Sequence, residues 1–389
     1  MAISGTRTDP VALAQALIRC PSVTPADAGA LDLIENALAA MGFECTRLPF
    51  GEGAARIDNL YARLGDAPPH FCFAGHSDVV PAGDRTAWSV DPFAGETKGP
   101  LLIGRGAADM KGAIAAFISG VELFLARNGT PPGSISCLIT GDEEGVAANG
   151  TVKVLEWLAA HGERIDHCLV GEPTSRERLG DTLKNGRRGS LNAWIKVQGA
   201  QGHVAYPQHA DNPIPRLVRF LDAVMARRLD EGTPAFDPSH LEVTDIAVGN
   251  GAENVIPATA SARLNIRFND RHQGADLVAW LEEVASATAG EHELATRVSG
   301  EAFLTPEGPF SRMLCAAVAA VEGIRPTLST SGGTSDARFI ARHCPVVELG
   351  LVGATMHKAD EAVPADDIRR LARIYEAVLQ RYFVPETQS

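Results

Sequence analysis

Short apolar runs alternate with longer amphipathic segments through the first half of the chain. A repeat of about 3.6 residues between apolar positions predicts a helix, and a short continuous apolar run predicts a buried strand. The expected helices are Val11–Cys20, Ala30–Met41, Gly112–Ala126 and Val152–His161, and the expected strands are Phe71–Ala74, Ser134–Thr140 and His167–Val170. Alternation of strands and helices indicates an α/β sheet with parallel strand pairs.

The pattern changes after about Arg188. Strands are expected at Leu191–Val197, Leu241–Val248, Ala260–Phe268 and Leu294–Ser299, and helices at Pro213–Leu229 and Ala275–Ala289. Their order, β-α-β-β-α-β, is that of a ferredoxin-like module. The first pattern then resumes with helix Ser311–Glu322, strand Pro345–Leu349 and helix Ala365–Tyr382. We therefore predict a mixed-sheet α/β domain formed by residues 1–188 and 302–389, interrupted by a smaller α+β domain at residues 189–301.

Composition excludes several classes of protein. The chain has 35 Lys and Arg against 48 Asp and Glu, a formal net charge of −13, which argues against binding to nucleic acid or to an anionic membrane surface. No apolar run is long enough to span a membrane, and Met1–Arg7 lacks the apolar core of a signal peptide. The seven cysteines are scattered and form no CxxC pair. We expect a cytoplasmic protein with reduced thiols.

Residues that can bind a metal gather at the ends of the expected strands. The candidates are His76, Asp78, Glu143, Glu144, Glu172 and His357, each expected just past the carboxyl end of a strand, and Asp109, expected where a strand passes into a helix. Sites in open α/β sheets form beyond the carboxyl ends of the strands, so these side chains are expected to converge on one sheet edge.

Histidines together with several carboxylates suit a borderline divalent metal such as zinc. The carboxylates exceed the needs of one tetrahedral ion, which favours two ions that share a bridging carboxylate, about 3.5–4 Å apart in hydrolases of this kind. His76 and Asp78 point to the same side of an extended segment, so Asp78 is expected to orient His76. Of Glu143 and Glu144, one would bind metal and the other act as general base, and the spacing does not say which.

Each motif also has a purely structural interpretation. His76-Ser77-Asp78 fits a solvated turn, Asp142-Glu143-Glu144 fits an acidic loop, and Asp109 fits an acid at a helix N-terminus. These interpretations leave unexplained why every motif is expected at the same edge of the sheet. The resemblance of Gly104-Arg105-Gly106 to a dinucleotide-binding loop is rejected because Asp109 would repel a pyrophosphate.

Five segments together resemble the motifs of the M20 metallopeptidase family across the whole chain. They are Gly75–Pro81, Gly104–Gly112, Gly141–Gly145, Gly171–Pro173 and Met356–Lys358. The resemblance implies a mixed-sheet metallo-exopeptidase-like catalytic domain, with an inserted ferredoxin-like domain for dimerisation. Small departures are Ser77, where the family more often has Thr, and Asp360, where Asn is more usual.

The family resemblance also implies roles for single residues. Two Zn²⁺ ions per subunit are expected, for which Co²⁺ substitutes, with Asp109 as the bridging ligand. His76 and Glu172 would complete one metal site, and Glu144 and His357 the other. Glu143 would be the general base and acid, and Asp78 would support His76.

Within the family, three segments most resemble the branch that hydrolyses N-succinyl-L,L-2,6-diaminopimelate to succinate and L,L-2,6-diaminopimelate in lysine biosynthesis. They are Gly104–Gly112, Gly186–Leu191 and Ser331–Phe339, and Ala108 stands where the acetylornithine deacetylase branch usually has Cys. The alternatives are another M20 amidase (acetylornithine deacetylase, aminoacylase or carboxypeptidase) and a non-catalytic protein that binds metal or a small molecule.

A small amide substrate with several carboxylates needs cationic forks, and Arg is suited to bidentate carboxylate binding. The candidates are Arg187, Arg188, Arg267 and Arg338, with Asn254 as a polar partner. Backbone N–H groups and hydroxyls of Gly332, Gly333, Thr334 and Ser335 would also suit a carboxylate. The alternatives are solvated arginines and an ordinary Gly/Ser turn.

His203 lies in the expected inserted domain, in the segment Gly199–Val204. The family resemblance implies that this histidine reaches the active site of the partner subunit and stabilises the developing oxyanion. It therefore also implies a homodimer and a closing motion between domains. The alternative is a turn histidine beside glycine.

Overall fold

The computed structural model describes residues 9–384, so the expectation for Met1–Arg7 lies outside the described residues. Contacts between residues divide the chain into two compact units. Unit 1 holds the residues up to Asn185, Thr305–Ser329 and the residues from Ser335 on, and unit 2 holds Gly186–Leu304 and Thr330–Thr334. Between Asp9 and Val384, none of the helices combines the length and the apolar character that a membrane span requires.

Within the described residues, unit 1 is built on an eight-stranded sheet with the order β1-β2-β6-β3-β7-β18-β8-β17. The strands are β1 (Glu44–Arg47), β2 (Leu60–Leu64), β3 (His70–His76), β6 (Ser134–Thr140), β7 (His167–Val170), β8 (Thr182–Lys184), β17 (Thr327–Ser329) and β18 (Val346–Glu348). β3 pairs in parallel with both β6 and β7, whereas β1, β2 and β6 pair antiparallel. The sheet is therefore mixed, and its central parallel strands point their carboxyl ends to one edge.

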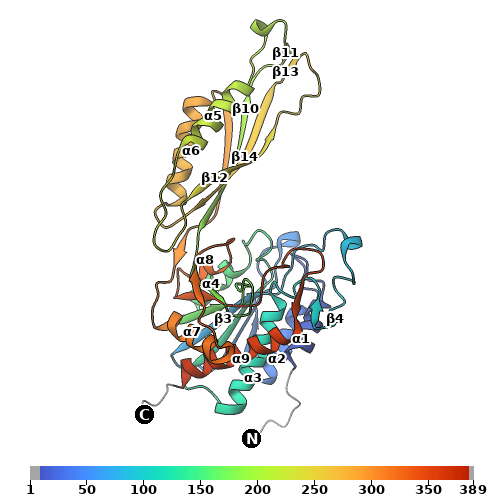
Figure 1. Ribbon diagram of the computed structural model, residues 1–389, viewed down its shortest axis with the longest axis vertical. Coiled ribbons are helices and arrows are strands. Elements are labelled where there is room, and N and C mark those ends of the chain that lie inside the picture. Colours follow the sequence, from blue (N-terminus) through green and yellow to red (C-terminus); the bar gives the residue numbers. More distant parts are fainter. Residues whose placement is uncertain (1–8, 385–389) are drawn as a thin grey trace. The chain divides into compact units, whose positions relative to one another are not determined.

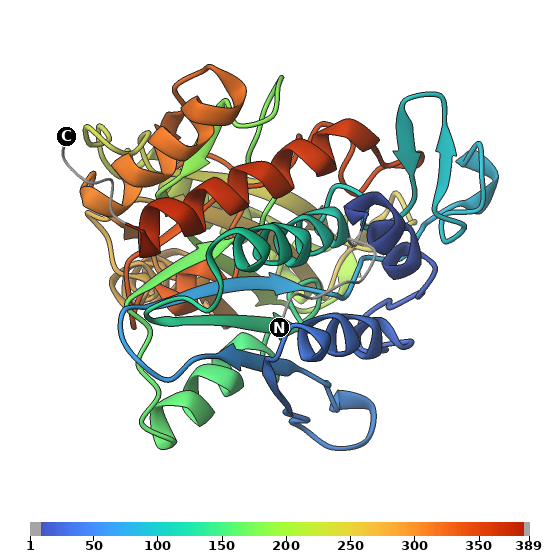
Figure 2. The ribbon, with the colours of Figure 1, turned by 90° about the horizontal axis from the view of Figure 1, so that it is seen from below.

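Helices cover this sheet on both sides. They are α1 (Pro10–Ile18), α2 (Ala30–Ala40), α3 (Lys111–Asn128), α4 (Thr151–Ala160), α7 (Pro309–Glu322), α8 (Ala337–Ile340) and α9 (Ala365–Phe383). Figure 2 shows α3 and α9 side by side on one side of the sheet and α4 on the other. The Phe73 and Phe117 rings stack at 4.1 Å between β3 and α3, and Tyr375 of α9 packs edge-on against both rings. This apolar contact fixes α3, and with it the turn that precedes α3, against β3.

A second, smaller sheet of unit 1 has the order β19-β5-β4 in the described part of the chain. Its strands are β4 (Glu96–Lys98), β5 (Leu101–Ile103) and β19 (Ala362–Pro364). β5 and β19 pair antiparallel, with Ala362 opposite Ile103. This pairing places the chain that leaves β5 beside the chain that enters β19.

Unit 2 contains an antiparallel sheet with the order β12-β14-β10-β15. The helices and strands of unit 2 are β9 (Gly186–Arg187), β10 (Gly189–Gln198), β11 (Gly202–His203), α5 (Ile214–Ala226), β12 (His240–Ala247), β13 (Val255–Ile256), β14 (Thr259–Phe268), α6 (Gly274–Thr288), β15 (His292–Gly300) and β16 (Phe303–Leu304). Leu191 and Ile195 of β10 are buried in one cluster with Phe220 of α5 and Leu281 of α6. Figure 1 shows both helices along this sheet, and the strand order is that of a ferredoxin-like fold.

The long helices and the central strands lie within a few residues of their predicted positions, and several short strands were not predicted. Unit 2 extends beyond the predicted insertion of residues 189–301, because β9 pairs with β16, with Arg187 opposite Phe303. Its extra segment Thr330–Thr334 is tied to it by Thr330, whose hydroxyl donates to the carbonyl of Ala235. That the two units serve as a catalytic domain and a dimerisation domain stays a prediction.

Candidate metal centre

Three neighbouring parallel strands of unit 1 place polar side chains at one sheet edge. His76 is the last residue of β3, Glu143 and Glu144 follow the end of β6, and Glu172 follows the end of β7. His76 is 1% exposed and Glu172 8% exposed. The parallel pairing of β3 with both neighbours brings these side chains together at the carboxyl edge, as the sequence predicts.

The prediction that Asp109 lies where a strand passes into a helix is confirmed, although that strand belongs to the small sheet, and the prediction that His357 directly follows the end of a strand is wrong. Asp109 follows β5 of the small sheet across a turn, and His357 lies in an irregular segment between β18 and β19. His357 has a positive φ of 62°, a conformation that is unusual for a residue with a Cβ atom. The antiparallel pairing of β5 with β19 carries both residues to the edge of the large sheet.

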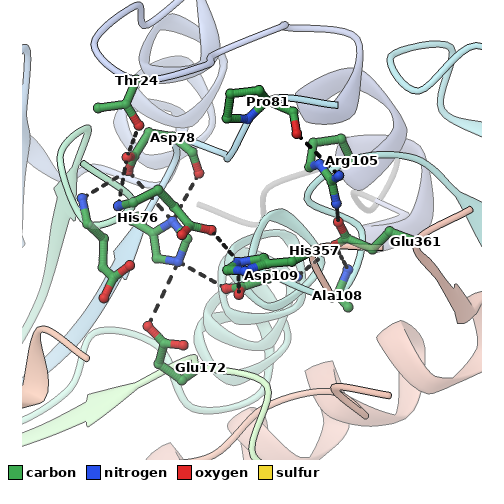
Figure 3. A network of polar contacts seen from close by, with 12 residues as sticks. Thr24, His76, Asp78, Pro81, Arg105, Ala108, Asp109, Glu172, His357 and Glu361 are labelled. Carbon is green, nitrogen blue, oxygen red and sulfur yellow. Dashed lines mark hydrogen bonds and ion pairs between the residues drawn. The ribbon is translucent and has the colours of Figure 1, made fainter. Parts of the chain in front are cut away.

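Asp109 lies between two histidines. Its Oδ1 atom is 3.1 Å from Nε2 of His76, and its Oδ2 atom is 3.3 Å from Nε2 of His357. Nε2 of His357 is also 2.9 Å from Oε1 of Glu144, and Nε2 of His76 is 3.8 Å from Oε1 of Glu172. Figure 3 shows the dashed contacts that join the Asp109 carboxylate to His76 and to His357. One carboxylate thus presents each oxygen to a different cluster of potential ligands.

Among residues 9–384, two overlapping groups have potential ligand atoms within 4.8 Å of one another. One group is His76, Asp109 and Glu144, and the other is His76, Glu143 and Glu172. Glu143 therefore lies as close to potential ligands as the residues expected to bind metal. The division of roles between Glu143 and Glu144 stays a prediction.

Asp78 organises the backbone of the neighbouring loop. Its Oδ1 atom accepts a hydrogen bond from the backbone N–H of Glu143 at 3.3 Å, and its Oδ2 atom accepts from Glu144 N–H at 3.1 Å. The hydroxyl of Thr24 donates to the same Oδ2 at 2.6 Å. Nδ1 of His76 is closer to the backbone carbonyl of Asp78, at 3.0 Å, than to its carboxylate, at 3.6 Å. Asp78 thus orients His76 through its backbone and the two glutamates through its side chain.

The two histidines and Asp109 favour one another's charged forms. Burial disfavours a charged His76, but the hydrogen bond and charge of Asp109 outweigh it and raise the pKa of His76. Hydrogen bonds to Asp109 and Glu144 raise the pKa of His357 to about 10. Burial works against an ionised Asp109, yet His357 and His76 hold its pKa below the ordinary range.

The environment of the two other buried carboxylates disfavours their charged forms. Burial, reinforced by Asp336 and Glu144 despite the proximity of His76, raises the pKa of Glu143 to about 8. Burial, with Asp109 and Glu143 nearby, raises the pKa of Glu172 well above its ordinary value. A dication is the partner that would neutralise such a cluster, and imidazole nitrogens with carboxylate oxygens are ligands that zinc accepts. The residues present therefore fit a divalent metal centre.

Two glycines let the Asp109 turn approach the sheet. A Cβ atom at Gly75 or at Gly171 would lie 2.6 Å from the terminal methyl of Met110. At Gly171 it would also lie 2.6 Å from the Phe73 ring. The Met110 side chain therefore packs into a space that only glycine leaves free, which holds the residue next to Asp109 close to β3 and β7.

Arg338 is the one of the four candidate arginines that lies in unit 1 within the described chain. It is 8% exposed, and its Nη1 atom is 4.0 Å from Oε1 of Glu143. Its Nη2 atom is 3.9 Å from Oδ1 of Asp336, and its guanidinium lies 4.2 Å from the centre of the Phe339 ring. The Arg338 guanidinium thus lies near two carboxylates of unit 1, and its role toward a substrate stays a prediction.

The other predicted substrate-binding residues belong to unit 2. Arg187 is 8% exposed, and its Nη1 donates to the carbonyl of Gly333 at 3.0 Å, next to Thr334. Arg267 is half-buried, and burial together with the charge of Arg188 lowers its pKa. The structure thus joins Arg187 with Gly333 and brings Arg267 near Arg188.

Asn254 and His203 lie together in another part of unit 2. His203 of β11 pairs with Val255 of β13, and the carbonyl of Asn254 accepts a hydrogen bond from the N–H of Val204. His203 is exposed, and its Nδ1 accepts from the N–H of Ala205 at 3.1 Å. The imidazole of His203 is therefore accessible on the surface of unit 2.

Sequence reasoning assigned no role to three residues that contact the centre or its loops. Thr24 holds Asp78, and a buried pair, Arg105 with Glu361, contacts the backbone at Asp109. A signal existed for Arg105, which is a charged residue between two glycines inside one of the site motifs, whereas Glu361 follows the polar residues Lys358 and Asp360 and does not stand out. Thr24 has no comparable signal, since a threonine in a loop is ordinary.

The comparisons with known proteins agree with this geometry. Residues 72–381 match the model of Peptidase family M20/M25/M40. The succinyl-diaminopimelate desuccinylase of Rhodospirillum centenum is 62% identical over 376 residues, which cover 96% of this chain and 97% of that protein. Its counterpart from Caulobacter vibrioides is 61% identical over 379 residues, 96% of each chain.

A solved structure supports the fold. The M20 family metallo-carboxypeptidase Sso-CP2 from Sulfolobus solfataricus aligns with a TM-score of 0.82 at 15% identity, over 97% of this chain and 99% of its own. It has the same fold over nearly the whole of both chains. The family match, the similarity to curated relatives and the clustered ligand side chains lead to one conclusion: the chain belongs to Peptidase family M20/M25/M40 and is a metal-dependent hydrolase.

Proposed function

We propose that the protein hydrolyses N-succinyl-L,L-2,6-diaminopimelate to succinate and L,L-2,6-diaminopimelate, a step in lysine and diaminopimelate biosynthesis. The observation that carries this proposal is the pair of ligand clusters around Asp109, with Glu143 beside them. The substrate comes from the relatives named above, which are desuccinylases at about 60% identity over nearly the full chain.

The proposed cofactor is two Zn²⁺ ions per subunit, for which Co²⁺ substitutes. Asp109 would bridge them, His76 and Glu172 would complete one site, and Glu144 and His357 the other. A dinuclear metal-binding M20 peptidase from Bacillus subtilis aligns with a TM-score of 0.70 at 16% identity, over 97% of this chain and 98% of its own. Bound ions would act as Lewis acids on the amide carbonyl and on the attacking water.

Glu143 is the proposed general base and acid. Its burial and its neighbours raise its pKa, so in this environment it holds a proton more readily than an ordinary glutamate. It would take the proton from the attacking water and later give it to the leaving nitrogen. Asp78 fixes the Glu143 and Glu144 backbone N–H groups, which keeps these two side chains in their separate roles.

Cationic and polar groups would bind the carboxylates of the substrate. The proposed residues are Arg187, Asn254, Arg267, Gly333 and Thr334. Arg187 and Gly333 are already linked by a hydrogen bond, and Arg338 lies beside Glu143. Planar guanidinium groups suit a substrate with several carboxylates, because each can bind a carboxylate through two parallel hydrogen bonds.

The proposed assembly is a homodimer in which His203 of one subunit acts in the site of the other. The exposed position of His203 on unit 2 supports this, because its imidazole is free to meet a surface outside its own unit. An N–H donor from His203 would stabilise the negative charge that develops on the carbonyl oxygen.

The decisive experiment measures kcat/KM of zinc-loaded protein for succinyl-diaminopimelate, acetylornithine and a dipeptide side by side. We expect succinyl-diaminopimelate to be preferred by a factor of about 10³ or more, since a site that pairs buried cations with substrate carboxylates rejects analogues that lack them. Preference for acetylornithine or the dipeptide would move the protein to another M20 activity. Zinc binding without hydrolysis of any of the three would indicate a non-catalytic binding protein.

A further inference from the structure

Glu361 contacts the backbone from which Asp109 projects. It is fully buried, and its Oε1 atom accepts hydrogen bonds from the backbone N–H groups of Ala108 at 2.9 Å and Asp109 at 3.1 Å. Figure 3 shows the Glu361 carboxylate facing Ala108 on the side of Asp109 away from His76. One carboxylate oxygen thus fixes the two N–H groups that set the direction of the Asp109 side chain.

Arg105 connects Glu361 to two further segments of the site. Its Nη1 atom donates to Oε2 of Glu361 at 2.7 Å and to the carbonyl of Lys358 at 3.3 Å. Its Nη2 atom donates to the carbonyl of Pro81 at 3.3 Å. Lys358 directly follows His357, and Pro81 lies in the irregular segment that follows His76. The guanidinium therefore contacts the backbone next to His357 and the backbone of the segment that follows His76.

The surroundings hold Arg105 in place. Its guanidinium lies 5.1 Å from the centre of the Trp88 ring, and the residue is only 2% exposed. The backbone N–H of Gly104 donates to the carbonyl of Glu361 at 2.9 Å. The segment of Gly104 and Arg105 thus binds the segment of Glu361 through both side-chain and backbone hydrogen bonds, so the Arg105–Glu361 pair has little freedom to rearrange.

Stability alone is a weak explanation for this arrangement. A buried ion pair loses solvation, and replacing such a pair with apolar residues of similar volume is often neutral or stabilising. What an apolar pair would not supply is the set of hydrogen bonds to Ala108, Asp109, Lys358 and Pro81. The geometry therefore favours a role in placing the loops.

We propose that Arg105 and Glu361 are a positioning pair that sets the separation of the two metal ligands His76 and His357 across Asp109. The proposal rests on the metal roles proposed above. Neither residue acts on the substrate; the pair acts through the three backbone segments that carry the ligands. Groups that orient metal ligands typically change metal affinity or activity by about 10–100-fold when they are removed.

The experiment compares Glu361→Gln with a matched control, Glu322→Gln. The Glu322 side chain is also buried, at 2% exposed, and it pairs with Arg370 between α7 and α9. Zinc affinity is measured by competition with a chromophoric chelator, and the folded fraction by near-UV circular dichroism. kcat and KM for succinyl-diaminopimelate are measured at saturating zinc.

We expect Glu361→Gln to weaken binding of at least one zinc ion by about 10–100-fold. We expect kcat to fall while KM stays near its wild-type value, because the substrate-binding groups are untouched. Glu322→Gln should bind zinc as the wild type does, whatever it does to stability. Arg105→Lys keeps a cation beside Glu361 but lacks the planar fork that reaches both carbonyls, so it should weaken zinc binding to a lesser degree.

Folded Glu361→Gln that binds zinc like the wild type would overturn the proposal. If Glu361→Gln does not fold, Arg105→Lys decides by the same measurement, and wild-type affinity there would overturn the proposal. These outcomes differ from failure of the proposed function, in which the wild-type protein itself would bind no zinc or cleave none of the amides tested.

Discussion

The Oδ2 atom of Asp109 lies 3.3 Å from Nε2 of His357, although the two residues come from different loops of unit 1. The other oxygen of the same carboxylate faces His76. Met110 packs into the space left by Gly75 and Gly171, which holds the turn from the side of the sheet. The position of Asp109 is therefore determined by packing on one side and by backbone hydrogen bonds on the other.

Replacing Glu143 with Gln should leave metal binding intact and remove most of the activity. Glutamine keeps the size of the side chain and cannot take up a proton, and loss of a general base typically costs about 10²–10⁴-fold in rate. Metal content by atomic emission and kcat by a continuous amide hydrolysis assay test this prediction.

The matched control for Glu143→Gln is Glu282→Gln, an equivalent change at an exposed position of α6. It should leave both readouts unchanged. Near-normal kcat in Glu143→Gln would show that another group is the base. Loss of a metal ion in that variant would instead make Glu143 a ligand, which its position beside His76 and Glu172 also allows.

The sequence predicts the large elements of the fold well because their cause is local. The apolar run Ser134–Thr140 is a buried strand with the predicted bounds, and the amphipathic segment from Ala365 forms α9. The two-residue strands β9 and β16 were missed, because a pair such as Arg187 with Phe303 carries no periodic pattern. Their pairing depends on contacts between segments that are distant in the chain.

The candidate site was also predicted only in part, because some of its residues are brought together by contacts between distant segments. The convergence of His76, Glu144 and Glu172 follows from parallel strands. The approach of Asp109 and His357 to the same edge does not follow from parallel strands, because it depends on the small β19-β5-β4 sheet. The sequence did predict that Asp78 supports the site, but it did not predict which backbone groups Asp78, Glu361 and Arg105 bind, because backbone partners leave no residue pattern.

Metal should stabilise the protein more at pH 8 than at pH 5.5. In the metal-free protein the pKa of Glu143 is about 8 against an ordinary 4.5, and that of His357 is about 10 against 6.5. Both are raised in the folded state, so the stability they contribute is present at low pH and is lost as pH rises through the folded values. Metal binding needs the deprotonated ligands and therefore tightens over the same range.

Thermal unfolding of metal-free and zinc-loaded protein at the two pH values tests this dependence. We expect the gain in Tm on adding zinc to be larger at pH 8. In Glu143→Gln the metal-free protein should lose less stability between pH 5.5 and 8 than the wild type does, because the group that titrates there is gone. Equal gains in Tm at both pH values would contradict the prediction.

Gly171→Ala should destabilise the protein more than Gly75→Ala. At Gly171 the added Cβ atom meets the rigid Phe73 ring as well as Met110, whereas at Gly75 the atoms nearest to it belong to the flexible Met110 side chain. Overpacking of this kind costs about 1–3 kcal/mol, measured as the change in the free energy of unfolding in urea. Gly251→Ala, where nothing lies within 4 Å of the added atom, is the neutral control. Equal costs for the three variants would show that this close packing does not matter.

Asp78→Asn should lower activity by about 10–100-fold, the usual effect of losing a group that orients metal ligands. Asparagine offers a single acceptor oxygen where Asp78 uses two, for the N–H groups of Glu143 and Glu144 and the hydroxyl of Thr24. Thr24→Ser keeps a hydroxyl near Asp78 and should retain activity, whereas Thr24→Val should lose part of it. Full activity in Asp78→Asn would mean that the loop holds its shape without the carboxylate.

Mixing two inactive variants tests whether His203 acts across a dimer. Glu143→Gln lacks the proposed base and His203→Ala lacks the proposed oxyanion donor, so each homodimer should be nearly inactive. In a mixed dimer, one site combines an intact Glu143 with His203 from the other subunit. Random exchange of equal amounts in a two-fold dimer should therefore restore roughly a quarter of wild-type activity.

The recovery should appear only after subunits exchange, which size-exclusion chromatography of differently tagged chains would follow. Activity that stays at background after exchange would place His203 in its own subunit's site or outside the reaction, because only a donor from the partner allows two defective chains to complete one site.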